Sequence, residues 1–183
     1  GIKIDLKSKV KELYGDQIKQ VATAALEKLG IEHCSLQIED TGALDWIIAA
    51  RVEAAAKQLI DIKEEYLPEF KSYNQYKTTR ERDRLSRLYL PGNNPKMMLN
   101  AGIHHPHGII LDLEDAVAPA KKHEARYMVR NALRSVNFYG AERMVRINQG
   151  DMGIEDLAYV IMYTCSLFLK LKTLPIFVNS TKK

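Results

Sequence analysis

Strand-like and helix-like segments alternate between residues 85 and 161, and this alternation limits the fold of that region more than any other feature. Strands that alternate with helices through short loops form parallel sheets with right-handed crossovers. The uninterrupted apolar run at 109–111 is typical of a strand buried on both faces, as a parallel sheet requires. The region is therefore expected to be α/β. The strand-like segments are LSRLYL, GIILDL and RMVRIN, and the helix-like ones are KMMLNAG, PAKKHEARYMVRNALRSV and GIEDLAYVI.

Residues 1–60 have a different pattern, which predicts a small α+β domain. Apolar residues recur at helical spacing in 8–29 and 44–60, and they alternate with polar residues in IEHCSLQIED, which lies between. Ser8 is the expected N-cap of the first helix and Gly30 its stop. Because two helices and one strand make a thin core, a further strand is expected, either at GIKIDL or upstream. The apolar stripes expected to be buried are Val10, Leu13, Ile18, Val21, Ala25 and Leu29, then Ile47, Ile48, Val52, Ala55 and Leu59.

The segment 61–84 separates these two patterns. It mixes charged and aromatic residues, contains Pro68 and has no periodicity, which is typical of a linker or a docking arm. We therefore expect a domain at 1–60, a linker or docking arm at 61–84, a second domain at 85–161 and an atypical tail at 162–183.

Composition excludes several classes of protein. With 46% hydrophobic and 27% charged residues, the chain is expected to be soluble and globular. The net charge is +4, but the Lys and Arg residues are interleaved with Glu and Asp and form no basic stripe, so nucleic-acid binding is not expected. No secretory signal and no apolar run of about 18 residues is present, so we expect no membrane contact and a cytoplasmic location. Cys34 and Cys165 are far apart, and Cys34 is expected in the core.

Three acids follow the buried strand directly, at Asp112, Glu114 and Asp115. In parallel α/β folds active sites gather where strands end, and a carboxylate removed from water needs a cation or hydrogen-bond donors. A functional site is therefore one interpretation. The alternative, equally supported by spacing, is that the acids cap the following helix or pair in solvent with Lys121, Lys122 or Arg126.

Two further segments adjoin that strand end. Arg146 ends the next strand, where it could bind a carboxylate with two hydrogen bonds or simply pair with Glu114 or Asp115. The segment PGNN at 91–94 predicts a tight turn whose amides and Asn side chains could line a site.

The HHPH segment contains three histidines, His104, His105 and His107. Pro106 breaks the segment, and no acid or cysteine is spaced around it as zinc ligands usually are. A surface loop is the favoured interpretation, and a metal site is the alternative.

Two stretches resemble two subunits of citrate lyase. Residues 85–160, through LYLPGNNPKMM, GIILDLEDAVAPAKKHEAR and MVRIN, resemble the citryl lyase (beta) subunit of the HpcH/HpaI aldolase and citrate lyase superfamily. Residues 4–59, through YGDQIK and DTGALDWIIAARVEAA, resemble the acyl carrier (gamma) subunit. Finding both on one chain makes each resemblance more credible.

The resemblance implies a (β/α)8 barrel of TIM type that uses Mg2+ to cleave a citryl thioester on the carrier into oxaloacetate and the acetyl thioester. Arg146 then corresponds to the arginine that holds a substrate carboxylate. Glu114 and Asp115 correspond to the acids beside the metal, with Asp115 the better candidate for proton handling, and Asp112 is expected to be structural. Implied partners are the alpha (transferase) subunit and the acyl carrier, within an oligomer.

The chain also departs from this family. The direct metal ligands are expected on later strands, beyond an IPK strand that the segment after residue 161 does not match. A complete barrel needs roughly 200 to 250 residues, and the chain from residue 85 onward supplies fewer than half of them, enough for three βα units. The chain is therefore expected to be a fragment, a truncated product or a frameshifted one.

The carrier half departs as well. Its modified serine, which carries phosphoribosyl dephospho-coenzyme A, is expected upstream of Gly1 and is absent from this chain. Two alternatives to a citrate lyase enzyme stay open. One is a non-catalytic carrier or interaction piece, and the other is an aldolase or lyase acting on a coenzyme A thioester such as citramalyl or malyl.

Overall fold

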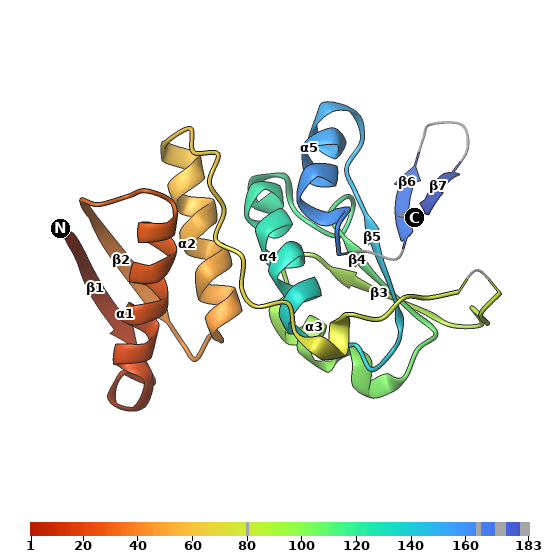
Figure 1. Cartoon of the computed structure of the whole chain (residues 1–183), viewed down its shortest axis with the longest axis horizontal. Coiled ribbons are helices and arrows are strands. Elements are labelled where there is room, and N and C mark those ends of the chain that lie inside the picture. Colours follow the sequence, from red (N-terminus) through yellow and green to blue (C-terminus); the bar gives the residue numbers. More distant parts are fainter. Residues whose placement is uncertain (80, 164–165, 171–174, 180–183) are drawn as a thin grey trace. The chain divides into compact units, whose positions relative to one another are not determined.

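The chain forms two compact units, Gly1–Pro68 and Glu69–Lys183 (Figure 1). A computed structural model describes residues 1–79, 81–163, 166–170 and 175–179, the last two stretches by their backbone alone. Cys165 and part of the expected tail at 162–183 lie outside these ranges. None of the helices within the described ranges combines the length and the apolar character needed to cross a membrane.

The first unit contains two parallel strands and two helices. Its elements are β1 (Ile2–Ser8), α1 (Lys11–Lys28), β2 (Cys34–Asp40) and α2 (Asp45–Leu59). The strands pair from Ile2 opposite Cys34 to Ser8 opposite Asp40, so the additional strand expected at GIKIDL is confirmed. Side chains from β1, α1 and α2 form the core, and Cys34 packs against its edge as expected. The fully buried members are Leu6, Ile18, Ala22, Ala25, Leu26, Ile48 and Val52.

Four expectations in this unit are wrong in detail, and one of them is the burial of Ala55, which is exposed. Ser8 does not cap α1, because it ends β1 and its Oγ donates to Asp40 Oδ2 at 2.7 Å. Leu13 is 82% exposed, because 100° per residue places it about 140° around the helix from Ile18. Leu59 is 84% exposed, because it occupies the last position of α2. Gly30 has a φ of 76° just after α1 ends, which confirms its role as a stop.

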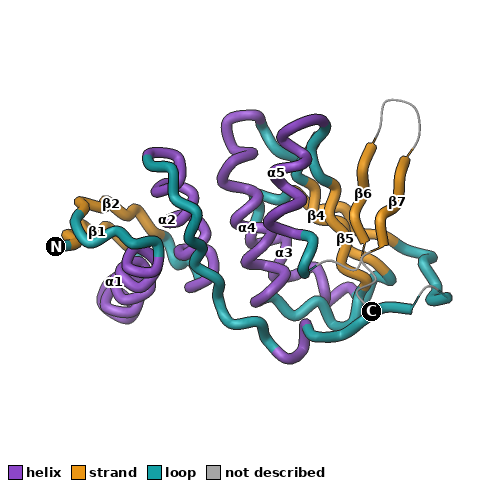
Figure 2. Tube along the Cα trace, turned by 45° about the horizontal axis from the view of Figure 1, so that its top comes forward, coloured by secondary structure: helices purple, strands orange, loops and turns teal. Residues whose placement is uncertain are grey.

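The second unit is an α/β layer, as the alternation predicts. It contains β3 (Arg87–Pro91), α3 (Pro95–Ala101), β4 (Gly108–Asp112), α4 (Lys122–Ser135), β5 (Glu142–Arg146), α5 (Gly150–Val160), β6 (Ser166–Lys170) and β7 (Pro175–Asn179). The sheet order follows the chain, and the first three pairings are parallel. Every residue of β4 is buried. Helices α3, α4 and α5 gather on one side of the sheet (Figure 2). The β6–β7 pairing is antiparallel, which a repeat of strand and helix does not predict.

The segment expected as a linker or docking arm divides between the two units. Residues 69–79, here called the strap, contain only the short 3-10 helix η1 (Ser72–Asn74). Within the second unit, side chains of the strap donate hydrogen bonds to backbone carbonyls. These bonds hold the strap against the end of α4 and the loop that follows. These bonds are Tyr73 Oη to Ser135 O at 2.6 Å, Asn74 Nδ2 to Val136 O at 2.7 Å and Tyr76 Oη to Ala141 O at 2.6 Å.

Candidate active site

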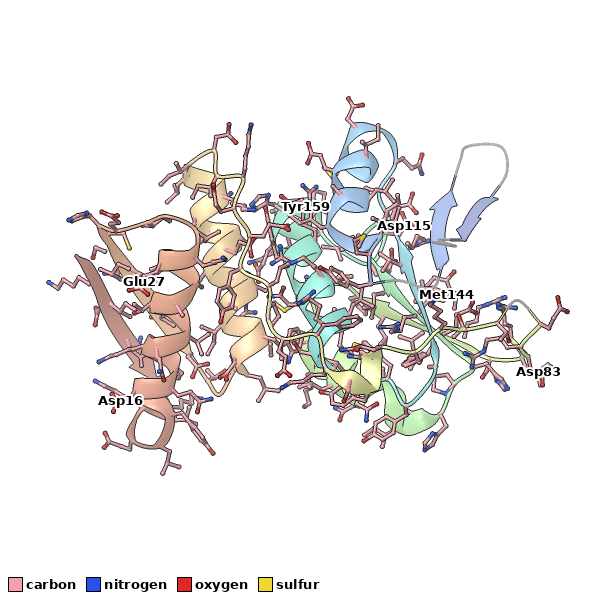
Figure 3. All side chains as sticks on the ribbon, viewed as in Figure 1. Asp16, Glu27, Asp83, Asp115, Met144 and Tyr159 are labelled. Carbon is pink, nitrogen blue, oxygen red and sulfur yellow. The ribbon has the colours of Figure 1, made fainter. Side chains whose placement is uncertain are left out.

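The C-terminal ends of β3, β4 and β5 lie side by side, and the PGNN turn, the three acids and Arg146 lie at or just after these ends. In the parallel register Pro91 is the Cα partner of Asp112, and Asp112 is the partner of Arg146. Parallel pairing therefore brings the PGNN turn, the acidic segment and Arg146 to one edge of the sheet. Asp115 lies at this edge, where β5 leads toward α5 (Figure 3).

Gly92 allows the turn after β3 to approach the end of β4. Its amide donates to Asp112 O at 2.7 Å. A Cβ on Gly92 would lie 2.8 Å from Asp112 O and 2.9 Å from Val129 Cγ2, closer than real contacts allow. Asn94, in the same turn, uses its Oδ1 to cap α3 by accepting from the Met97 amide at 3.1 Å. The turn therefore fixes the edge of the site, and Asn94 serves as a helix cap.

Asp112 and Arg146 form the central ion pair of the site. Arg146 Nε donates to Asp112 Oδ1 at 2.8 Å, and Arg146 Nη2 donates to Asp112 Oδ2. Asp112 is 1% exposed and also accepts from the amides of Glu114 at 2.8 Å and Ala116 at 3.1 Å. Both carboxylate oxygens are thus engaged. This arrangement suits a residue that shapes the turn and orients the guanidinium.

The same contacts set the charge state of the pair. Burial alone would raise the pKa of Asp112, but the hydrogen bonds and charge of Arg146, with the amides of Glu114 and Ala116, outweigh it and hold that pKa below 3.8. The hydrogen bond to Asp112 raises the pKa of Arg146 above its ordinary value, against the opposing effect of burial. The pair is therefore fully ionised at neutral pH.

Glu114 and Asp115 lie on either side of the same guanidinium but differ in exposure. Glu114 Oε2 lies 3.5 Å from Arg146 Nε, and Asp115 Oδ2 lies 3.2 Å from Arg146 Nη1. Glu114 is buried, whereas the Asp115 side chain is 64% exposed. Gln149 Nε2 donates to Glu114 Oε1 at 2.5 Å, while Glu114 Oε2 is buried without a hydrogen-bond partner. One acid is thus held inside the site and the other can move into solvent.

The alternative roles considered for these acids, as caps of the following helix or as partners of nearby lysine and arginine side chains in solvent, do not occur. Helix α4 has Lys121 at its N-cap and no side-chain cap, so none of the three acids caps it. Lys121 pairs with Glu124, and Arg126 pairs with Glu155 and Asp156. Lys122 donates to the Leu113 and Glu114 carbonyls and to Asn148 Oδ1, not to the side chain of any of the three acids. The alternative for Arg146, an ion pair with Glu114 or Asp115, does occur, together with the closer pair to Asp112.

The histidine segment is a surface turn apart from this site. His104 ends the 3-10 helix η2 (Gly102–His104), and His105 has a φ of 47°, so the chain turns sharply there. Both are exposed, whereas His107 Nδ1 lies 3.0 Å from Ser86 Oγ. Across the ranges that the structure describes, no three His, Cys, Asp or Glu side chains group so that they could hold a metal ion.

Three further residues complete the candidate site; the sequence did not single out Tyr89 or Gln149, and it named Lys122 only as a possible partner of the acids in solvent. The Tyr89 ring centre lies 5.7 Å from Arg146 Cζ, within range of a cation–π contact. Gln149 orients Glu114, and Lys122 Nζ donates to the carbonyls of Leu113 and Glu114. Gln149 could have been found from its position directly after the strand that carries Arg146. Tyr89 has no such signal, because aromatic residues in strands are common, and nothing in the sequence favours Lys122 over Lys121.

Comparison with known proteins follows the same division of the chain. Residues 1–59 match the family described as malonate decarboxylase delta subunit, and residues 85–167 match the HpcH/HpaI aldolase/citrate lyase family. The second match continues six residues past the expected end at 161.

Individual relatives bear the names of two citrate lyase subunits. The chain is 48% identical over 68 residues to citrate lyase subunit beta of Leuconostoc mesenteroides subsp. cremoris, covering 37% of this chain. It is 38% identical over 92 residues to the Escherichia coli (strain K12) subunit beta, covering 49% of this chain. It is 47% identical over 64 residues to the citrate lyase acyl carrier protein of Lactobacillus acidophilus, covering 35% of this chain.

The matched segments span only part of these relatives, 22% and 30% of the two beta subunits and 66% of the carrier protein. The resemblance noted in the sequence motifs is nevertheless confirmed on both sides of the strap. This chain joins a segment similar to citrate lyase acyl carrier proteins to a segment of the HpcH/HpaI aldolase/citrate lyase type.

Proposed function

We propose that this chain is a component of a citrate lyase, in which an acyl-carrier-like unit precedes the first part of a citryl lyase barrel. The observation that carries the proposal is the position of Arg146, at the C-terminal end of a parallel strand and in contact with Asp112, Glu114 and Asp115. In barrels of this architecture such strand ends are where catalytic residues lie. The parent reaction would be cleavage of a citryl thioester to oxaloacetate and an acetyl thioester.

Arg146 is proposed to bind a carboxylate of the substrate. Two of its nitrogens are engaged by buried Asp112, which fixes the plane of the guanidinium. Its Nη1 faces the exposed Asp115, which can move away without leaving a buried group unpaired. A substrate carboxylate could then take that position, because a planar guanidinium can donate hydrogen bonds to carboxylates along more than one of its edges. The Tyr89 ring covers another part of the guanidinium.

The chemistry is a retro-aldol cleavage. A base removes the proton from the citryl hydroxyl, the oxygen forms the ketone of oxaloacetate, and the electron pair of the broken carbon–carbon bond passes to the α-carbon of the departing acetyl thioester and is delocalised onto its carbonyl oxygen. The resulting enolate then takes up a proton to give the acetyl thioester. Asp115 is the proposed proton-handling group, because its exposure lets it exchange protons with solvent. Glu114 is held in place by Gln149.

Mg2+ is the expected cofactor, and the residues present fit only part of its site. The buried Oε2 of Glu114, without a hydrogen-bond partner, is the observation that suits a nearby cation or its water. When bound, Mg2+ would polarise the oxygen that becomes the ketone. Glu114 and Asp115 would meet it through its waters or the substrate, and direct ligands are expected on later strands.

The remaining assignments follow from the two matched segments. The first unit is proposed to work with an acyl carrier that holds its substrate on phosphoribosyl dephospho-coenzyme A, and the alpha (transferase) subunit is the proposed further partner in an oligomer. A carrier-like half favours a carrier-bound citryl group over a free coenzyme A thioester, since a free thioester needs no carrier.

The experiment that tests the carboxylate site is a titration of this chain with oxaloacetate and Mg2+, followed by nitrogen NMR of the side chains. The Arg146 Nε and Gln149 Nε2 signals are expected to shift with oxaloacetate and to stay in place with equal ionic strength of chloride. If both signals stay in place at saturating oxaloacetate while the backbone spectrum shows a folded protein, the carboxylate site is wrong and a non-catalytic interaction piece is the better account.

A further inference from the structure

Lys122, the first residue of α4, donates to acceptors on two separate loops of the site. Its Nζ lies 2.7 Å from Glu114 O and 3.2 Å from Leu113 O, both in the turn after β4. The same Nζ also donates to Asn148 Oδ1, in the loop after β5. An ammonium group has three donors, so all of them are used.

Asn148 is a fixed acceptor because it is itself anchored. Its backbone amide and its Nδ2 donate to Asp156 Oδ2 at 3.0 and 2.7 Å. Asp156, on α5, is fully buried, and its other oxygen accepts from Arg126 Nε at 3.1 Å. The loop after β5 is therefore tied to both α4 and α5, and Lys122 extends that buried network to the acidic turn.

The neighbouring residue completes a second tie between the same two loops. Gln149, next to Asn148, donates to the Glu114 side chain, whereas Lys122 binds the Glu114 carbonyl. Glu114 is thus held by both its backbone and its side chain. Without the ammonium, the carbonyls of Leu113 and Glu114 would lose a charged donor, and the turn could move away from Arg146.

We propose that Lys122 is a positioning residue, whose ammonium joins the turn at 113–116 to the loop at 147–149 and so sets Glu114 and Asp115 against Arg146. Its consequence for catalysis rests on the proposed function, but the positioning itself can be measured without turnover. Removal of comparable supporting groups around active-site ligands typically costs about 10- to 100-fold in affinity or activity.

Lys121 provides a matched control one residue away. Its side chain is exposed, and its Nζ lies 3.3 Å from Glu124 Oε2 on the same helix. Removing that ammonium should leave the turn unchanged, because a solvent-exposed pair of this kind contributes little.

The test compares Lys122→Met with Lys121→Met in this chain by amide hydrogen exchange. The amides of Glu114 and Ala116, which donate to Asp112, report on the turn, and the amide of Ile110 in β4 reports on the sheet. In Lys122→Met the two turn amides are expected to exchange about 10- to 100-fold faster, with Ile110 unchanged. Lys121→Met should leave all three unchanged, and Lys122→Arg should restore part of the protection.

Two results would overturn the proposal: unchanged turn amides in Lys122→Met, or equal acceleration at Ile110, which would show a general structural role. If Lys122→Met does not fold, Lys122→Gln, which keeps one donor amide, is compared in the same way. A wild-type chain that does not respond to oxaloacetate would contradict the proposed function alone, because the exchange pattern does not depend on it.

Discussion

Arg146 and Asp112 are Cα partners on adjacent parallel strands, and their side chains are joined by two hydrogen bonds. The pairing places a guanidinium at the strand ends with its plane fixed by a buried carboxylate. Glu114 and Asp115 extend from the same turn toward it. The stability of the turn and the geometry of the proposed site therefore depend on one ion pair.

Asp112→Ala should destabilise the second unit strongly. The substitution leaves Arg146 without its closest partner and the amides of Glu114 and Ala116 without an acceptor. Breaking a buried pair in this way costs about 3 to 5 kcal/mol of unfolding free energy. Urea unfolding measures the loss, and Asp83→Ala, at an exposed position, is the control. Equal midpoints for the two variants would contradict the structural role of Asp112.

Asp112 should also make the unfolding free energy of the chain depend on pH in the acidic range. Its pKa is lowered in the folded state, so between that lowered pKa and about 5 the unfolded chain binds more protons than the folded one. Unfolding free energy should therefore fall as pH drops from about 5 through 3.8 toward the lower folded pKa. Urea midpoints across this range should fall more steeply for the wild type than for Asp112→Asn, which cannot titrate there. Parallel curves would show that Asp112 does not contribute.

Gly92→Ala should destabilise the turn after β3 by steric overlap. The added Cβ would meet Asp112 O and Leu113 Cδ2, each at 2.8 Å. Overpacking of this kind costs about 1 to 3 kcal/mol, measurable by thermal unfolding. Gly140→Ala separates overlap from backbone strain, because Gly140 has a φ of 79° but open space around it. A Gly92→Ala variant as stable as the wild type would show that β3 and β4 lie further apart.

Asn74→Ala should loosen the strap. Asn74 is fully buried, and its Nδ2 donates to Val136 O at 2.7 Å. Losing this bond leaves a buried carbonyl without that donor and costs about 1 to 3 kcal/mol. The variant is expected to show faster proteolysis within residues 69–79. Gln75→Ala is the neighbouring control, since its side chain is exposed and bonds within the strap to Phe70 O. Equal proteolysis of both variants would contradict a docked strap.

Much of the fold is predictable from local patterns. The apolar run at 109–111 and the alternation of segments are enough to predict the parallel pairing of β3, β4 and β5. Leu13 and Leu59 show the limit of such patterns, because an apolar residue off the buried face or at the end of a helix stays exposed. The antiparallel pairing of β7 has no local signal either, since it depends on contacts between strands.

The sequence predicts which residues gather at the candidate site but not the contacts among them; their roles stay a prediction. Spacing and strand ends pointed to Asp112, Glu114, Asp115 and Arg146, and parallel register brings them together. Sequence alone could not show that Arg146 takes Asp112 as its closest partner, because that choice depends on strand register. It also could not separate Lys121 from Lys122, because only the path of the turn after β4 shows which ammonium faces inward.

Turnover in a chimera tests whether residues 85–160 supply a working citryl lyase site that depends on Arg146. Residues 85–160 of this chain would replace the matching part of the Leuconostoc citrate lyase subunit beta, and oxaloacetate formation from a citryl thioester with Mg2+ would be measured. We expect an active chimera in which Arg146→Lys, which loses the two-bond geometry, lowers kcat/KM by about 100-fold, while Arg87→Lys, at an exposed position, has no effect. A folded but inactive chimera, or full turnover in Arg146→Lys, would contradict this expectation.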